Sequence, residues 1–226
     1  HSDIAGDVRN IVDFTFLHGY LEPTLAILYE PTQTWVGRLA SAKDTFSVIV
    51  VSVDVSQKMF PVLYKIDGLP YNCTHIKPVP KPLGGLLVFS HNSLIYMDQA
   101  TPAPGLACVV NYFFDAETRL RSMPGSEETP LPPVKQQPPS VYYKTGRVTE
   151  LKDLGISLDG SSSVFLSPDI LLITLRNGDM YQVDLVGDFG IGRSWKRRRG
   201  GIKKFEFKAI GMRLMRASCL VPLPAV

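Results

Sequence analysis

Apolar and polar residues alternate with a period of two along much of the chain, and this pattern predicts β-strands. The run 45–54 is rich in β-branched residues, and the run 60–66 follows it after a short polar connection, 55–59. Two such runs joined by a few polar residues are typical of a β-hairpin. Pro61 fits the first positions of a strand or an edge strand, where a missing backbone donor is tolerated.

Two further hairpins are predicted at 86–97 and 170–185. Their loops are 90–93 and 176–179, and the second loop contains Asn177-Gly178. Asn-Gly is the strongest short-range hairpin signal, because both residues accept the positive φ of a type I′ turn. We therefore predict a turn of that type at this position.

These two hairpins are weakly similar to each other. When Asn92 is aligned with Asn177, Tyr96 falls on Tyr181 and 87–88 falls on 172–173. Such self-similarity is typical of repeated sheet units. Several hairpins with no helix between them indicate an all-β fold, and periodicity alone does not choose among a propeller, a sandwich and a barrel.

The segment 122–140 breaks the strand pattern. It contains six prolines and almost no apolar side chains. Burial of so few apolar groups does not offset the entropy of ordering the backbone, so we predict a disordered Pro-rich insertion. A proline-rich ligand for an adaptor domain is the alternative. Strand-like sequence resumes at 148–151, so the insertion is expected to lie within a single domain, 1–226.

The composition fits a globular chain: 226 residues, 45% apolar and 20% charged. No run approaches the roughly 18 apolar residues of a membrane-spanning helix, so no membrane partner is expected. The first residues lack the basic and then apolar regions of a signal peptide. Three scattered cysteines, Cys73, Cys108 and Cys219, fit neither a zinc site nor a disulfide framework. They are expected to be isolated thiols in a reducing compartment.

The sequence contains no enzyme signature. The histidines His1, His18, His75 and His91 lack the spacing of a zinc site, and there is no phosphate-binding loop or nucleophile elbow. The segment 187–192 contains Asp-Phe-Gly, but the other kinase motifs are absent, so we regard the triplet as coincidental. His18 is expected to be structural, because no acidic partner or nucleophile is identifiable near it. We therefore expect no catalysis, no bound metal and no cofactor.

A basic loop is predicted at 192–204. Between positions 193 and 208 the chain has eight basic residues and one acidic residue, a local net charge of +7, whereas the whole chain carries +3. Such a charge attracts phosphate or an acidic surface, and a tryptophan within it can stack on a base. Three interpretations stay open: a solvated loop without a ligand, a nuclear-import signal or acidic-partner site, and direct RNA contact. The candidate contact residues are Arg193, Trp195, Lys196, Arg197, Arg198, Arg199, Lys203 and Lys204.

Several phrases of the sequence resemble one protein family. They are Leu17-His-Gly-Tyr20 with Glu22-Pro-Thr24, Gln33-Thr-Trp35 with Gly37-Arg38, Gly68-Leu-Pro70, and Val79-Pro-Lys-Pro82 with Gly84-Gly85. The segments 156–160 and 171–175, with Tyr181, fit less tightly. These phrases are similar to the large, multi-propeller subunit of the eukaryotic cleavage and polyadenylation specificity factor, in the first of its β-propellers. The similarity runs from about residue 16 to residue 185.

This resemblance implies a partial, WD40-like β-propeller of roughly four blades, and it implies that the chain is a fragment or an incomplete gene model. It also implies a non-enzymatic scaffold of pre-mRNA 3′-end processing in the nucleus. The implied partners are a WD-repeat subunit and a zinc-finger subunit that read the polyadenylation signal, so pre-mRNA is contacted mostly indirectly. The Pro-rich insertion and the basic loop depart from the family pattern, and no binding residue is carried over from it.

Other functions stay open at this point. The first is a related propeller scaffold in splicing or DNA repair, which belongs to the same superfamily. The second is a direct RNA-binding module that acts through the basic loop. The third is an enzyme with a site at a propeller channel, since propellers also host enzymes.

Overall fold

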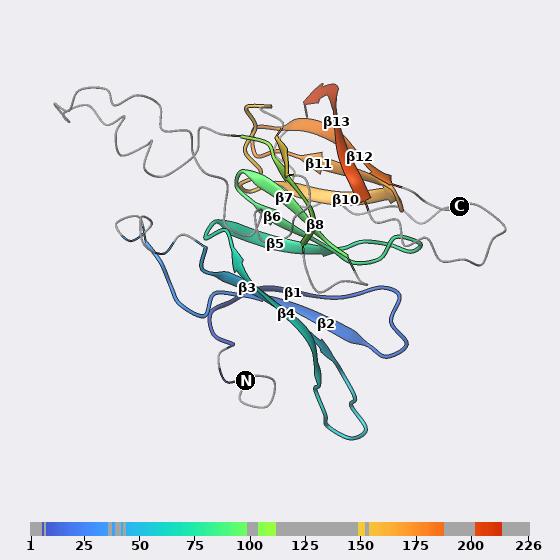
Figure 1. Ribbon diagram of the computed structural model, residues 1–226. Helices are drawn as coiled ribbons and strands as arrows, with labels where there is room; N and C mark the ends of the chain where they lie inside the picture. The colour runs from blue at the N-terminus through green and yellow to red at the C-terminus, as the bar shows by residue number, and fades with distance from the viewer. Residues whose placement is uncertain are drawn as a thin grey trace.

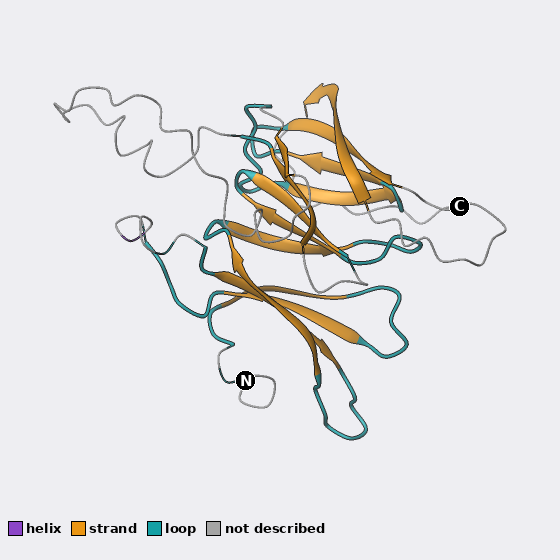
Figure 2. Cartoon of the chain, viewed as in Figure 1, coloured by secondary structure: helices purple, strands orange, loops and turns teal. Residues whose placement is uncertain are grey.

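The computed structural model of the chain describes residues 6, 8–35, 38, 42, 44–98, 104–111, 149–151, 154–187 and 202–213. Every named element in these residues is a β-strand, as the two-residue periodicity predicts (Figures 1 and 2). The strands form two four-stranded sheets and one five-stranded sheet. The sequence predicted roughly four blades, and the described residues form three sheets.

Each sheet uses a continuous part of the strand order. The first sheet contains β1 (Ile11–Phe16), β2 (Thr24–Tyr29), β3 (Phe46–Ser52) and β4 (Val62–Leu69). The second contains β5 (Cys73–Pro78), β6 (Leu86–Ser90), β7 (Ser93–Met97), β8 (Pro104–Val109) and β9 (Thr149–Leu151). The third contains β10 (Ser162–Ser167), β11 (Ile170–Thr174), β12 (Asp179–Gly187) and β13 (Ile202–Arg213). Neighbouring strands are antiparallel, except that β8 and β9 are parallel.

All three predicted hairpins are present. β3 pairs with β4, β6 with β7, and β11 with β12, each in antiparallel register. The last two occupy the same place in successive sheets, which explains their similarity. β9 confirms the strand-like sequence predicted at 148–151.

The turn between β11 and β12 differs from the predicted type I′ turn. Gly178 has a positive φ of 89°, whereas Asn177 does not appear among the described residues with positive φ. The Gly178 N–H donates to the Leu175 carbonyl (2.9 Å) and the Leu175 N–H donates to the Asp179 carbonyl (2.8 Å). The loop therefore has three residues, with a glycine in the left-handed position. The Asn177 side chain accepts from the Asp179 N–H (3.0 Å), which favours this geometry over the two-residue turn.

The three sheets stack face to face in chain order (Figure 1). One buried cluster joins the first and second sheets through residues such as Leu28, Val48 and Ile95. A second cluster joins the second and third sheets through Phe89, Ile173 and others. β3, β6 and β7 are buried along their whole length, because neighbours cover both of their faces. Stacked antiparallel sheets of this kind are the architecture of a partial β-propeller.

The first strands of successive sheets are tied to one another by side chains. The Ile76 N–H on β5 donates to Asp13 Oδ2 on β1 (2.8 Å). The Lys77 ammonium donates to the Ser163 carbonyl on β10. These contacts fix the sheets relative to each other, in addition to apolar packing.

A glycine allows the close approach that begins β6. Gly85 has a φ of 89°, and a Cβ at this position would lie 2.3 Å from the Met97 carbonyl oxygen on β7. The Tyr96 hydroxyl donates to the Gly84 carbonyl (3.0 Å) across the same turn. A side chain at position 85 is therefore excluded by both conformation and space.

Candidate interaction surface

Loops at one end of the sheets form a connected surface, which we call the loop end. It consists of the described residues of the β2–β3 connection (30–35, 38, 42, 44 and 45) and the turns 70–72, 90–93, 154–161 and 176–178. The His91 N–H donates to the Asn72 carbonyl (3.1 Å), and the Leu158 N–H donates to the His91 carbonyl (2.8 Å). The turn 70–72 follows Leu69, which pairs with Phe46 at the end of the 30–45 connection. All three sheets therefore contribute to this surface.

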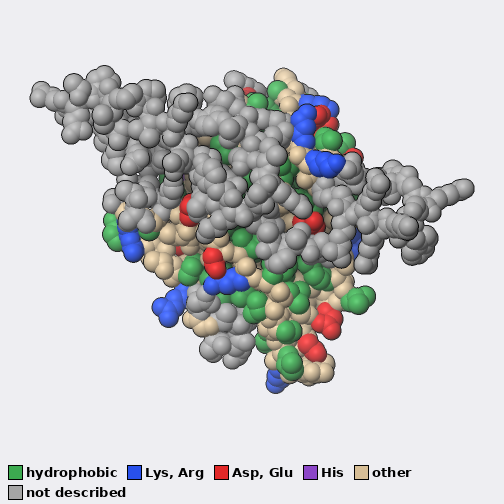
Figure 3. All heavy atoms as spheres, in the orientation of Figure 1, with side chains coloured by type: hydrophobic (Ala, Val, Ile, Leu, Met, Phe, Trp, Pro, Cys, Tyr) green, Lys and Arg blue, Asp and Glu red, His purple; other side chains and the backbone are tan. Residues whose placement is uncertain are grey.

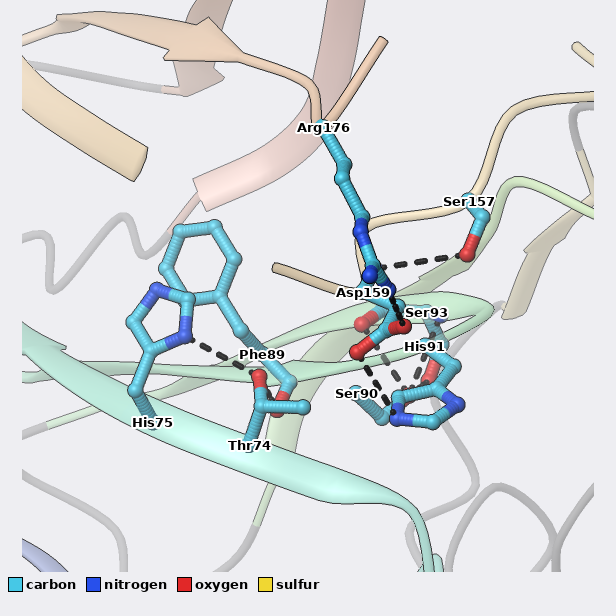
Figure 4. Close-up of polar contacts among 9 residues, drawn as sticks. All are labelled: Thr74, His75, Phe89, Ser90, His91, Ser93, Ser157, Asp159 and Arg176. Atoms are coloured by element: carbon cyan, nitrogen blue, oxygen red, sulfur yellow. Dashed lines mark hydrogen bonds and ion pairs between the residues drawn. The ribbon is translucent and has the colours of Figure 1, made fainter. Parts of the chain in front are cut away.

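At the loop end one carboxylate lies between a histidine and an arginine (Figure 4). Asp159 Oδ1 is 3.3 Å from His91 Nε2, and Asp159 Oδ2 is 3.5 Å from Arg176 Nη1. His91 and Arg176 belong to the β6–β7 and β11–β12 loops, the equivalent hairpins of successive sheets. Because the three side chains are 42–64% exposed, water screens these contacts and they stabilise the fold only slightly. Their effect is to orient two loops.

The turn that carries Asp159 is itself well defined. The Ser161 N–H donates to the Leu158 carbonyl (3.1 Å), and the Asp159 N–H donates to Ser157 Oγ (3.3 Å). Gly160 has a φ of 62°, in the left-handed region that favours glycine. The position of the carboxylate is therefore set by the backbone of its own turn.

His75 lies beside this surface but is a packing residue (Figure 4). Its ring stacks on Phe89, with 4.2 Å between centroids and 15° between planes, and its Nδ1 is 3.0 Å from Thr74 Oγ1. Burial lowers the pKa of His75 to about 4, against the opposing effect of the Asp13 carboxylate. The ring is therefore neutral near pH 7 and is not suited to act as a base there.

The β2–β3 connection presents an aromatic residue to solvent. Trp35 is 63% exposed, and the guanidinium carbon of Arg38 lies 5.6 Å from the centroid of a Trp35 ring. The Glu30 carboxylate accepts from the Thr34 N–H (3.2 Å) and the Thr45 hydroxyl (2.8 Å), which closes the base of the connection. An exposed tryptophan with a stacked arginine can contact a partner through both apolar area and charge.

Most of the predicted basic loop lies outside the described residues, and so does the Pro-rich insertion 122–140. Of the candidate contact residues, Arg193, Trp195, Lys196, Arg197, Arg198 and Arg199 are outside the described residues. Lys203 and Lys204 lie on β13, which begins at Ile202, so the last residues of the predicted basic loop 192–204 belong to a strand. Both are exposed, and Lys204 Nζ is 2.8 Å from Glu206 Oε1. The RNA-contact hypothesis therefore stays a prediction.

Two of the three cysteines are described. Cys73 and Cys108 are buried and form no disulfide, and burial raises the pKa of the Cys73 thiol. Cys219 lies outside the described residues. Within the described ranges no three His, Cys, Asp or Glu side chains gather in a way that could hold a metal ion. The same ranges contain no helix long and apolar enough to cross a membrane.

Sequence reasoning did not single out the His91–Asp159–Arg176 cluster or the Trp35–Arg38 pair as sites. The cluster joins residues far apart in the chain, and no spacing rule connects them. One signal was available: the alignment of Asn92 with Asn177 also places His91 on Arg176. Trp35 and Arg38 were noticed only as part of a resemblance.

Comparison of the sequence with known proteins finds relatives of the chain. No family model matches the chain. The chain is 33% identical over 186 residues to the cleavage and polyadenylation specificity factor subunit 1 of Drosophila melanogaster, covering 82% of this chain and 11% of the relative. It is 34% identical over 201 residues to a probable subunit 1 of Caenorhabditis elegans, covering 89% of this chain and 11% of the relative. The chain belongs to this subunit 1 family.

A fungal relative gives a shorter match at higher identity. The chain is 40% identical over 99 residues to Protein CFT1 of Yarrowia lipolytica, covering 44% of this chain and 8% of the relative. In all three comparisons the chain spans about a tenth of the length of the relative. The region that the chain shares with each relative is therefore a small part of that relative's length.

Proposed function

We propose that this chain contributes a propeller segment to a non-enzymatic scaffold of the pre-mRNA 3′-end cleavage and polyadenylation machinery. The observation that carries the proposal is the 33–34% identity to subunit 1 relatives over 82–89% of the chain. The stacked sheets support it, because they hold loops from three sheets in one hydrogen-bonded surface. Loops positioned by a rigid scaffold are common binding surfaces.

The finer parts of the proposal follow from the family. The scaffold acts in the nucleus, where it holds a WD-repeat subunit and a zinc-finger subunit that together read the polyadenylation signal. The segment belongs to the first propeller, and it contacts pre-mRNA mostly through those partners. It performs no catalysis and needs no cofactor.

Affinity purification of the full-length protein that contains this sequence tests the proposal. Nuclear extract should yield polyadenylation-factor subunits with the tagged protein, and depletion of the protein should reduce cleavage and polyadenylation of a reporter pre-mRNA. Recovery of splicing or DNA-repair subunits in their place would assign the chain to one of the related scaffolds and overturn the proposal.

The basic loop supplies a second candidate function, direct RNA binding. Eight basic residues lie between 193 and 208, and Lys203 and Lys204 extend this charge onto β13. Replacement of Arg197, Arg198 and Arg199 by Ala should weaken binding to AAUAAA and scrambled RNA equally. It should also flatten the salt dependence by up to roughly 0.7 in log–log slope for each lost contact. A change in localisation with unchanged RNA affinity would instead identify an import signal.

A further inference from the structure

The strongest unassigned feature at the loop end is the pair formed by Trp35 and Arg38. Trp35 exposes 63% of its surface although tryptophan is usually largely buried. Arg38 lies over its ring at 5.6 Å, so the two side chains form one amphipathic patch. Tryptophan and arginine are the residue types most enriched among those that dominate protein–protein binding energies.

Described residues of the connection that carries this pair are hydrogen-bonded to one another. Besides the Glu30 bonds at its base, the Thr34 hydroxyl donates to the Ala42 carbonyl (2.7 Å). The Arg38 N–H donates to the Trp35 carbonyl (2.8 Å), and the Ala42 N–H donates to the Arg38 carbonyl (2.9 Å). The bond from Arg38 to Trp35 restrains the two residues relative to each other before binding, so less conformational entropy is lost when a partner docks, which favours affinity.

The charge of this connection favours a protein over a nucleic acid. Its four charged residues are Glu30, Arg38, Lys43 and Asp44, so the net charge is zero. Binding to RNA depends on an excess of positive charge that neutralises phosphates, as at 193–208. Balanced charge with an exposed aromatic ring and a single arginine is instead typical of a protein interface.

We infer that the Trp35–Arg38 pair is an anchor for a segment of a partner protein that combines an apolar side chain with a nearby carboxylate. The apolar side chain packs on the exposed part of the Trp35 ring. The carboxylate accepts from the Arg38 guanidinium, whose planar set of donors matches carboxylate geometry. The inference rests on the proposed scaffold function, since the partner is a subunit of the same complex.

Photo-crosslinking in the full-length protein within its complex tests this inference. The photoreactive residue p-benzoylphenylalanine replaces Gln33, which is exposed and lies two positions from Trp35. The complex is purified through a tag, irradiated, and the crosslinked peptides are sequenced. We expect a crosslink to a peptide of another subunit that contains Asp or Glu beside an apolar residue.

Substitutions of Trp35 and Arg38 measure how much each side chain contributes to binding of the partner segment. Trp35→Ala should reduce the crosslink roughly tenfold or more. Arg38→Glu should reduce it more than Arg38→Gln, because it adds repulsion to the loss of the contact. Met59→Ala is the matched control: Met59 is 54% exposed and lies in the β3–β4 connection at the opposite end of the first sheet, so the crosslink should not change.

The remaining outcomes overturn the inference in distinguishable ways. A crosslink to RNA, to a second copy of the chain, or to no molecule in an intact complex contradicts the inference and leaves the scaffold function standing. A crosslink that survives both Trp35→Ala and Arg38→Glu does the same. Failure of the unmodified protein to copurify with polyadenylation subunits contradicts the scaffold function and the inference together.

Discussion

The first and third sheets each have one face turned away from the second sheet, and these two outer faces differ in chemistry. On the first sheet the cross-strand register aligns Phe14 with Ile27 and Ile27 with Ile49, an apolar row that ends opposite Lys65 on β4. On the third sheet the register aligns Gln182 with Lys208 and Asp184 with Glu206, polar pairs of β12 and β13 that lie opposite Leu172 and Ile170 on β11. The inner faces of both sheets are apolar and buried.

The difference indicates that the two outer faces have different surroundings. Phe14 is 64% exposed and Phe16 is 54% exposed, and Figure 3 shows apolar side chains gathered in the lower half of the view, over the first sheet. A patch of large exposed apolar residues is typical of a surface that another element covers. The charged pairs of β12 and β13 need no such cover, because water solvates them. Apolar cover is therefore favoured over the first sheet more than over β12 and β13 of the third.

Substitutions on the two outer faces test this difference. The largest loss of stability is expected at the centre of the apolar face. Ile49 is 1% exposed, packed with Ile27 and Val51. Ile49→Ala should lower the free energy of unfolding by about 2–5 kcal/mol, through lost burial and the cavity that remains. Gln182→Ala on the opposite outer face is the control and should change it by no more than about 0.5 kcal/mol. Urea denaturation measures both, and equal effects would show that the two faces do not differ.

The junction of the second and third sheets, where His75 stacks on Phe89, gives a reference for a covered face. Burial lowers the pKa of His75 to about 4, below its ordinary value of 6.5. The unfolded chain therefore binds this proton more readily, so stability is complete above about pH 6.5 and falls as the pH drops toward 4. The loss should total roughly 3 kcal/mol and should disappear in His75→Gln.

A control histidine separates this effect from general acid unfolding. The His91 side chain is 42% exposed, so His91→Gln should leave most of the pH dependence between 6.5 and 4 in place. Denaturation at several pH values measures the slope for each variant. An unchanged slope in His75→Gln would mean that the junction is open to water.

The sequence predicted those parts of the fold that depend on local pattern. The hairpins β3–β4, β6–β7 and β11–β12 follow from alternating apolar residues and short polar loops, which act over neighbouring positions. The prediction of a type I′ turn at Asn177-Gly178 was wrong. The Asn177 side chain accepts from the Asp179 N–H, and of these two residues only Gly178 has a positive φ. The His91–Asp159–Arg176 cluster could not be predicted, since it depends on how two sheets are stacked.

A smaller effect is expected at the exposed edge of the apolar face. Phe14→Ser with Phe16→Ser should reduce self-association of the chain, because the substitutions remove exposed apolar area that can pair between molecules. The free energy of unfolding should change by only about 1 kcal/mol, since both rings already face solvent. Analytical ultracentrifugation over a range of concentrations measures association. The control is Lys204→Ser on β13, which should leave it unchanged, and equal association in all three proteins would contradict an interaction-prone first sheet.

The smallest effect is expected on the polar face. The Lys208 ammonium donates to the Asp184 carboxylate, and Gln182 Nε2 donates to its other oxygen (2.6 Å). These bonds, that from Lys208 first, lower the pKa of Asp184 below its ordinary value of 3.8. The folded chain therefore favours the carboxylate, and its contribution to stability is present above pH 3.8 and is lost as the pH falls through the lower folded-state pKa. Asp184→Asn should destabilise the chain slightly near pH 7, less so in high salt, and progressively less as the pH falls below 3.8. Urea midpoints at pH 7 and over a series of lower pH values measure this. A loss as large as that of Ile49→Ala would mean that the polar pairs of β12 and β13 form a buried interface rather than a solvated surface.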